Sequence, residues 1–209
     1  CNGTFYTSSL LLGNGFSIAC NQNFDLSNLT QQMINSNPII SSIFRHLQKG
    51  NLDIEETMRI VNDSKKVLEY FYQQNQNADF YKAIGALDKF SNDLRNQFIT
   101  TIKDNHISTI ENSAKISAFN FIKPYNYIFT LNYDLLLYWV TSLDWAAFSD
   151  GFGRADDGLL FNHNFGAKPF YFLHGALHLF CVKWNAKKIA YYNNNLLLQI
   201  ENKIRLNEF

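Results

Sequence analysis

Three short segments of the 209-residue chain end an apolar run in glycine or in polar side chains that could do chemistry. The first is residues 12–17, with the sequence LGNGFS, which follows the run TSSLLL. A glycine turn here would let the backbone bend sharply and let a ligand approach it without a Cβ in the way. A helix beginning near Ser17 would point its free N–H groups and positive dipole end at that opening, which suits a phosphate. The alternative is an ordinary strand-to-helix turn with Ser17 as the N-cap.

The second segment, residues 129–134 (FTLNYD), ends a strand-like run in an amide and a carboxylate. Polar groups at the carboxyl ends of parallel strands lie where α/β proteins bind ligands, so Asn132 and Asp134 are candidate site residues. Each also has an ordinary structural use. Asp134 could cap the following helix, and Asn132 could fill a turn.

The third segment, residues 172–178 (FLHGALH), places a histidine directly after an apolar run. His174 could act as a base near neutral pH, and the alternative is a hydrogen-bonded core histidine. We interpret His178 as structural. No third ligand is evident near the two histidines, and the three cysteines include no CxxC pair, so we expect no metal site.

The sequence pattern that indicates the positioning elements changes along the chain from strand-like to helical and back. Residues 125–130 and 169–173 are aromatic and β-branched, as strands are. From about Leu26 to Ala118, apolar residues recur at helical spacing. The pattern therefore predicts an α/β fold with a parallel sheet, into which a helical block is inserted after the first strand.

The remaining segments carry weaker patterns. We expect a core made of residues 1–24 and 121–209, C-terminally incomplete because the chain reads as a fragment, and a helical insertion over 25–120. Within the core the sequence predicts a helix over 134–143, a polar glycine-rich loop over 150–166, short strands at 178–183 and 188–192, and a final helix over 196–206.

Composition excludes several classes of protein. Lys plus Arg and Asp plus Glu both number 18, so the chain lacks the basic excess of a general nucleic-acid binder. Apolar residues make up 46% and charged residues 17%, as in globular proteins. No apolar run approaches the ~20 residues that cross a bilayer, and three scattered cysteines form no disulfide framework. We therefore expect a cytoplasmic protein without nucleic-acid or membrane partners.

Taken in order, the three segments resemble the NAD-binding core of sirtuins, where GAGxS, a Gln-Asn-Ile-Asp segment and a His-Gly pair follow one another. The sequence is more similar to bacterial sirtuin-like proteins with GNGxS, NYD and LHGALH, a set that includes abortive-infection phage-defence proteins. The similarity covers about residues 8–20 and 125–182. The cysteine pairs of the sirtuin zinc ribbon and the family's later Gly-Ser segment are absent from this sequence.

The resemblance implies a Rossmann-like sheet that binds NAD as a substrate, without a metal, and cleaves its nicotinamide–ribose bond. Asn132 would position the ribose hydroxyls or the attacking water, and His174 would be the base. Asp134 would hold the carboxamide of nicotinamide or fix its loop. The cofactor-binding turn would consist of Gly13, Asn14, Gly15, Phe16 and Ser17.

Two other functions stay open at this point. The same fold could be a non-catalytic module that senses NAD or a related nucleotide, although such a module needs neither an amide nor a base at the strand ends. The helices of the insertion could instead make the chain an interaction domain.

As an enzyme of anti-phage defence, the protein would deplete NAD on infection, and the helical insertion would contact a sensor partner or a second copy.

Overall fold

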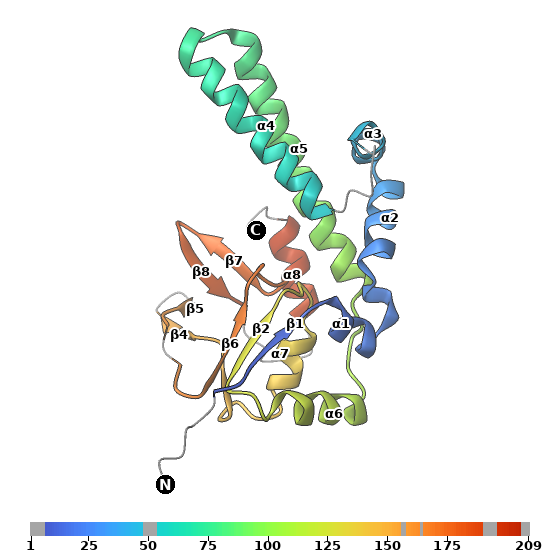
Figure 1. Cartoon of the computed structure of the whole chain (residues 1–209), viewed down its shortest axis with the longest axis vertical. Coiled ribbons are helices and arrows are strands. Elements are labelled where there is room, and N and C mark those ends of the chain that lie inside the picture. Colours follow the sequence, from blue (N-terminus) through green and yellow to red (C-terminus); the bar gives the residue numbers. More distant parts are fainter. Residues whose placement is uncertain (1–6, 48–53, 156–157, 164, 190–195, 206–209) are drawn as a thin grey trace. The chain divides into compact units, whose positions relative to one another are not determined.

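The computed structural model describes residues 7–47, 54–155, 158–163, 165–189 and 196–205 (Figure 1). The chain divides into two compact units. The first unit combines Cys1–Asp25 with Ile102–Phe209, and the second is Leu26–Thr101. Because the three chemical segments all belong to the first unit, that unit carries the candidate site.

The first unit is a mixed α/β structure built on a four-stranded parallel sheet. Its strands lie in the order β1 (Ser9–Leu12), β2 (Tyr127–Thr130), β6 (Lys168–Phe172) and β3 (Phe148–Ser149). In the register, Leu12 lies opposite Thr130, and Thr130 opposite Phe172. The carboxyl ends of β1, β2 and β6 are therefore neighbours at one edge of the sheet.

Several short helices belong to the same unit as this sheet, and some of them contribute to its core. They are α1 (Asn14–Cys20), the 3₁₀ turn η1 (Gln22–Phe24), α6 (Asn112–Ile122), α7 (Leu136–Thr141) and α8 (Leu196–Arg205). Every residue of α7 is buried. Its apolar side chains join those of the sheet and α6 in one cluster, made of Leu12, Ile122, Ile128, Leu137, Val140, Phe148 and Phe170. The predicted helix over 134–143 is thus present in a shorter form.

A second, antiparallel sheet follows in the same unit. Its order is β4 (Phe152–Ala155), β5 (Gly158–Phe161), β8 (Asn185–Lys188) and β7 (Leu179–Val182). The prediction of a polar loop over 150–166 is wrong, because β4 and β5 form a hairpin there. Glycines in this segment favoured a loop. One of them, Gly153, lies against the end of the Asn162 side chain, which would have to shift if a larger residue replaced the glycine.

The strands and helix at the end of the chain follow the sequence pattern more closely. β7 lies within the strand predicted at 178–183, and α8 ends one residue before the predicted helix. β8 comes earlier than the strand predicted at 188–192, of which residues 190–192 lie outside the described part. Across the described residues, every helix is too short or too polar to cross a membrane.

A buried ion pair ties the antiparallel sheet to the rest of its unit. Lys188 at the end of β8 pairs with Asp150, and both side chains are less than a tenth exposed. The Lys188 ammonium also lies 5.2 Å from the ring centre of Tyr138 on α7 and 5.3 Å from that of Phe152 on β4. The aromatic rings and the carboxylate together compensate the charge for its lost hydration.

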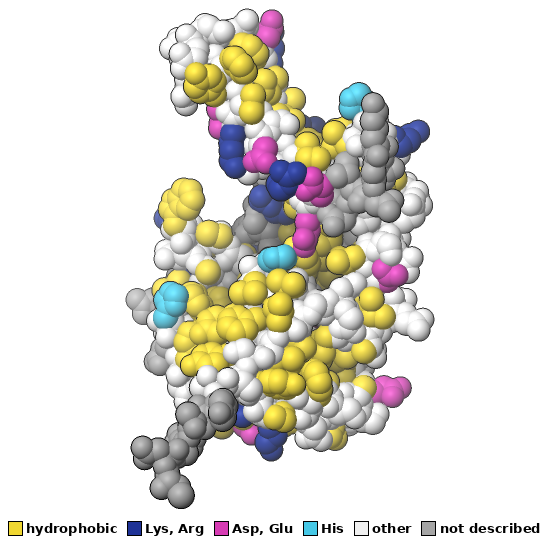
Figure 2. All heavy atoms as spheres, viewed as in Figure 1, with side chains coloured by type: hydrophobic (Ala, Val, Ile, Leu, Met, Phe, Trp, Pro, Cys, Tyr) yellow, Lys and Arg dark blue, Asp and Glu magenta, His cyan; other side chains and the backbone are white. Residues whose placement is uncertain are grey.

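The second unit is helical and consists of α2 (Leu26–Ser36), α3 (Pro38–Leu47), α4 (Ile54–Asn75) and most of α5 (Ala78–Asn105). It is shorter than the insertion predicted over 25–120, because residues 102–120 cluster with the first unit. α4 and α5 form a hairpin joined by the Lys65–Asp88 ion pair. Hydrophobic side chains are exposed near its free end (Figure 2), among them Val67, Tyr70, Phe71 and Tyr81.

We predict that Lys188→Met lowers the free energy of unfolding by about 3–5 kcal/mol, because Asp150 stays buried without its counter-charge. Adding Asp150→Asn should recover more than half of the loss, since an amide needs no counter-charge. Urea denaturation monitored by circular dichroism measures both. A loss below about 1 kcal/mol, the size expected of a surface pair, would contradict this account of the pair.

Candidate functional site

The sheet register brings the three chemical segments together. Just beyond the strands, the N–H of Leu131 donates to the carbonyl of Leu12 at 2.9 Å, and the N–H of Leu173 donates to Thr130 at 2.9 Å. The three loops therefore begin side by side. A further bond, from the N–H of Leu177 to the carbonyl of Tyr133 at 2.8 Å, joins the loop after β2 to the loop after β6.

A buried carboxylate links the first loop to the second. The hydroxyl of Ser17 donates to Oδ2 of Asp134, and the N–H of Leu136 donates to Oδ1 at 2.8 Å. Burial raises the pKa of the Asp134 carboxyl, and the hydrogen bonds from Ser17 and Leu136 lower it. Asp134 thus holds the first residue of α7, as the structural alternative predicted, and at the same time holds α1.

The glycine turn differs from the sequence prediction in where its helix begins. Gly13 is the N-cap of α1, in an extended conformation at φ −103° and ψ −172°, and no side chain caps the helix. Ser17 is therefore not the N-cap. It lies one turn inside α1, fully buried, where its hydroxyl meets Asp134.

Neither the backbone conformation nor the packing of this turn requires glycine at positions 13 and 15. Gly13 has a negative φ, and Gly15 lies outside the left-handed region, so other residues could adopt both conformations. A Cβ built at either position meets no atom within 4 Å. Of the two uses that the sequence suggested, a sharp turn and an approach to the backbone without a Cβ in the way, the open space beside the glycines agrees with the second.

Asn132 is buried with part of its hydrogen-bonding capacity unused. Its side chain is 7% exposed, and its backbone N–H donates to the hydroxyl of Thr130 at 3.0 Å. Its side-chain Nδ2 has no hydrogen-bond partner among the described residues. Buried amide groups are rarely left unpaired, because desolvation without a hydrogen bond is costly. A ligand or an ordered water at the strand ends would supply the missing acceptor.

His174 is exposed, so it is not the core histidine that the structural alternative describes. Its Nδ1 lies 3.3 Å from the hydroxyl of Tyr133, and the two ring centres are 5.8 Å apart. Gly175 has a φ of +83°, so the turn after the histidine does require glycine. Tyr133 was not predicted as a site residue. Its position inside the NYD segment was the available signal.

His178, by contrast, lies in the core. Its side chain is fully buried, stacked on Tyr138 at 4.2 Å and edge-on to Phe172 at 5.1 Å. Burial, and next to it the charge of Lys188, hold its pKa well below the ordinary value. The part of the chain that the structure describes brings no three His, Cys, Asp or Glu residues together in a way that could hold a metal ion.

A third histidine, His106, was missed by the sequence analysis. Its Nε2 accepts the N–H of Leu135 at 2.9 Å, while Nδ1 lies 2.8 Å from the carbonyl of Ile107 and donates to it. These two bonds require the neutral ring with its hydrogen on Nδ1. Burial lowers the pKa of His106 to about 4, against a smaller opposing effect of the bond to Ile107.

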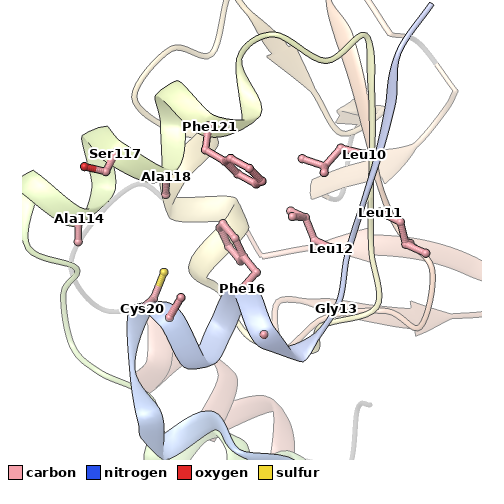
Figure 3. A pocket seen from close by; sticks show the side chains of 12 residues that line it. Leu10, Leu11, Leu12, Gly13, Phe16, Cys20, Ala114, Ser117, Ala118 and Phe121 are labelled. Atoms are coloured by element: carbon pink, nitrogen blue, oxygen red, sulfur yellow. The ribbon is translucent and has the colours of Figure 1, made fainter.

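A pocket of about 570 Å³ opens beside the glycine turn, between β1, α1 and α6 (Figure 3). The side chains of Leu12, Phe16 and Phe121 point into it. Its other lining residues are Leu10, Leu11, Gly13, Gly15, Ala19, Cys20, Ala114, Ser117 and Ala118. The pocket thus includes much of the predicted cofactor-binding turn, but not Asn132, Asp134 or His174, which lie at the strand ends.

The chain belongs to a family described as a domain of unknown function (DUF4917), whose model matches residues 10–208. The match spans all three segments and both units. No curated protein matches the chain. The geometry of the site itself must therefore indicate the function.

We predict that His106 makes stability depend on pH. Because its pKa is about 4 in the folded chain and ordinarily about 6.5, the unfolded chain binds a proton between these values that the folded chain does not. Stability should therefore fall as the pH is lowered through this window, by at most about 1.4 kcal/mol per pH unit for one group.

The matched variant is His106→Gln, whose amide oxygen can accept the Leu135 N–H without titrating. Urea unfolding at pH 7, 6 and 5 should show a smaller loss of stability for the variant than for the parent. His178 titrates in the same direction in both proteins and cancels in the comparison. Equal pH dependence of the two proteins would contradict the assignment.

Proposed function

We propose that this DUF4917 family member is an NAD glycohydrolase with a Rossmann-like, sirtuin-type core that cleaves the bond between nicotinamide and ribose. The observation that carries the proposal is the meeting of three chemically distinct loops at neighbouring strand ends. The Ser17–Asp134 and Tyr133–His174 hydrogen bonds connect them in pairs. Ligands of parallel α/β sheets bind at this edge.

The reaction makes limited demands on the protein. Nicotinamide leaves as a neutral molecule, so no general acid is required. The site must hold the ribose while positive charge develops on it, and must assist the nucleophile. His174 would take the proton from water or from a ribose hydroxyl, since it is exposed at the end of β6 and the Tyr133 hydroxyl contacts its ring.

Asn132 would bind the ribose hydroxyls or the attacking water through its side-chain amide. An asparagine that merely fills a turn normally bonds to nearby backbone. The unpaired, buried Nδ2 of Asn132 instead has a donor to offer to a ligand. The carboxylate of Asp134 is engaged by Ser17 and by Leu136. Of its two expected roles, these contacts favour fixing the loop over holding the nicotinamide carboxamide.

The sequence assigned the pyrophosphate to residues 13–17, and we now propose Gly13, Asn14 and Gly15 only. Ser17 is fully buried on Asp134, and the N–H of Phe16 already donates to the carbonyl of Gly13. We assign this role to the backbone of the turn, where Gly13 and Gly15 are exposed. The absence of any atom near a Cβ at Gly13 and Gly15 supports the assignment. Glycine there keeps space for a ligand that approaches the backbone closely.

The alternative function is a nucleotide-sensing module that binds NAD without turnover. The pocket favours it, because this cavity borders the glycine turn but includes neither Asn132 nor His174. In both cases the helical second unit would be an insertion between β1 and β2 that contacts a sensor partner or a second copy. We further propose a role in bacterial anti-phage defence, which follows from the family resemblance alone, and a cytoplasmic location, with which the free thiols of Cys20 and Cys181 agree.

Nicotinamide release from NAD tests the proposal. We expect His174→Ala and Asn132→Ala each to lower kcat, the former by about 10²–10⁴-fold as expected for loss of a catalytic base. His46→Ala, at an exposed position on α3, is the matched control and should leave the rate unchanged. Binding without release by the parent protein would favour the sensor, and full activity of both variants would refute the assigned roles.

A second prediction distinguishes the effect of the glycine turn on NAD binding from its effect on stability. Gly15→Ala should leave the protein as stable or stabilise it by up to about 1 kcal/mol, because alanine favours a helix and meets no neighbouring atom. The same methyl group should raise KM for NAD by about 10-fold or more, equal to about 1.4 kcal/mol of binding.

Gly85→Ala is its control, since Gly85 lies in α5 and a Cβ there also meets nothing within 4 Å. This control should gain similar stability without any change in KM. Thermal melts and initial-rate kinetics on the three proteins measure both quantities. An unchanged KM for Gly15→Ala would remove the pyrophosphate from the turn.

A further inference from the structure

His106 occupies a firmly held place just beyond the last residue of α5. Its backbone N–H donates to the carbonyl of Lys103 at 3.1 Å. Lys103 in turn pairs with Asp104 at 2.9 Å and with Glu201 on α8 at 3.7 Å. The turn that carries the imidazole is thus linked to α8 by an exposed ion pair, which adds little to the backbone hydrogen bond.

Two aromatic neighbours and two hydrogen bonds hold the His106 ring. Phe24 meets it edge-on at 5.1 Å and Trp139 at 4.8 Å, measured between ring centres. Its two nitrogens bond to Ile107 and Leu135. An imidazole held in this way presents one acceptor, Nε2, in one direction.

That acceptor is aimed at the candidate site. Leu135 directly follows Asp134, so the bond to His106 fixes the peptide group next to the carboxylate. The next N–H, of Leu136, is taken by Asp134 itself at 2.8 Å. Of two consecutive N–H groups, the first therefore donates to the neutral imidazole and the second to the Asp134 carboxylate. The other carboxylate oxygen accepts the hydroxyl of Ser17.

We propose that His106 is a positioning residue of the candidate site, which fixes the Asp134–Leu135 peptide and so keeps the Asp134 carboxylate on Ser17. Without the imidazole acceptor, the buried N–H of Leu135 lacks its partner and competes with Leu136 and Ser17 for Asp134. The loop after β2, which carries Asn132 and Tyr133, then loses its fixed orientation toward the loops after β1 and β6. The catalytic consequence of this role rests on the proposed NAD glycohydrolase function.

Two substitutions separate the acceptor from the volume of the ring. His106→Leu fills the space but accepts no hydrogen bond, whereas His106→Gln supplies an amide oxygen near the place of Nε2. We expect His106→Leu to lower kcat for nicotinamide release by about 10-fold or more, as loss of alignment does. His106→Gln should stay within about 3-fold of the parent, a rescue that a purely space-filling role would not show.

A second readout does not depend on activity. The thiol of Cys20, half-buried on α1, has a pKa raised by burial and by the charge of Asp134. Its alkylation by iodoacetamide at a series of pH values therefore reports on the Asp134 region. In a Cys1→Ser, Cys181→Ser background, His106→Leu should lower the midpoint pH, because both causes weaken when the loop loosens, and His106→Gln should leave it unchanged.

Phe24→Leu is the structural control. It removes one ring contact of His106 but leaves the bond to Leu135, so it should lower the melting temperature without moving the Cys20 midpoint. The proposal is overturned if His106→Leu keeps the parental midpoint, if His106→Gln behaves like His106→Leu, or if Phe24→Leu shifts the midpoint equally. Should the parent release no nicotinamide, the Cys20 measurement still decides whether His106 positions Asp134.

Discussion

A single buried carboxylate connects the parts of the candidate site. Asp134 is 5% exposed, and burial at that level is tolerated only when hydrogen bonds satisfy the group. Ser17 from α1 and the N–H of Leu136 from α7 do so. Because these partners come from elements that follow different strands, satisfying the carboxylate also fixes how the loops after β1 and β2 meet. His106 extends the same network by holding the adjacent peptide group.

The sequence was most informative where short segments combine an abrupt end of hydrophobicity with residues of special chemistry. The strands that end at Leu12, Thr130 and Phe172 were predicted in outline, and a parallel sheet aligns such ends through its register. Asn132, Asp134 and His174 could be selected because the carboxyl ends of parallel strands are where α/β proteins bind ligands, although capping and turn formation use the same residue types. The sequence could not decide whether Asp134 caps the following helix or belongs to the site. In the structure the same carboxylate accepts hydrogen bonds from the N–H of Leu136 in α7 and from Ser17.

Other features depend on contacts between residues distant in the sequence. His106 lies 29 positions from Leu135, and nothing near it in the chain marks the acceptor that it provides. The β4–β5 hairpin is a local feature, but the glycines of its segment, among them Gly153 beside the Asn162 side chain, favoured a loop over strands. The Asp150–Lys188 pair is nonlocal, because its members are 38 positions apart in the chain. Tertiary packing, not local propensity, decides the two nonlocal features.

The most direct test of the account is a titration of the ¹⁵N-labelled full chain with an NAD analogue whose nicotinamide–ribose bond cannot be hydrolysed, followed by NMR of assigned signals. If the three loops form one site, the backbone amides of Gly13 and Gly15, the side-chain amide of Asn132 and the ring of His174 shift together with one dissociation constant. Shifts confined to the glycine turn, with Asn132 and His174 unaffected at saturation, would contradict a shared site for binding and cleavage.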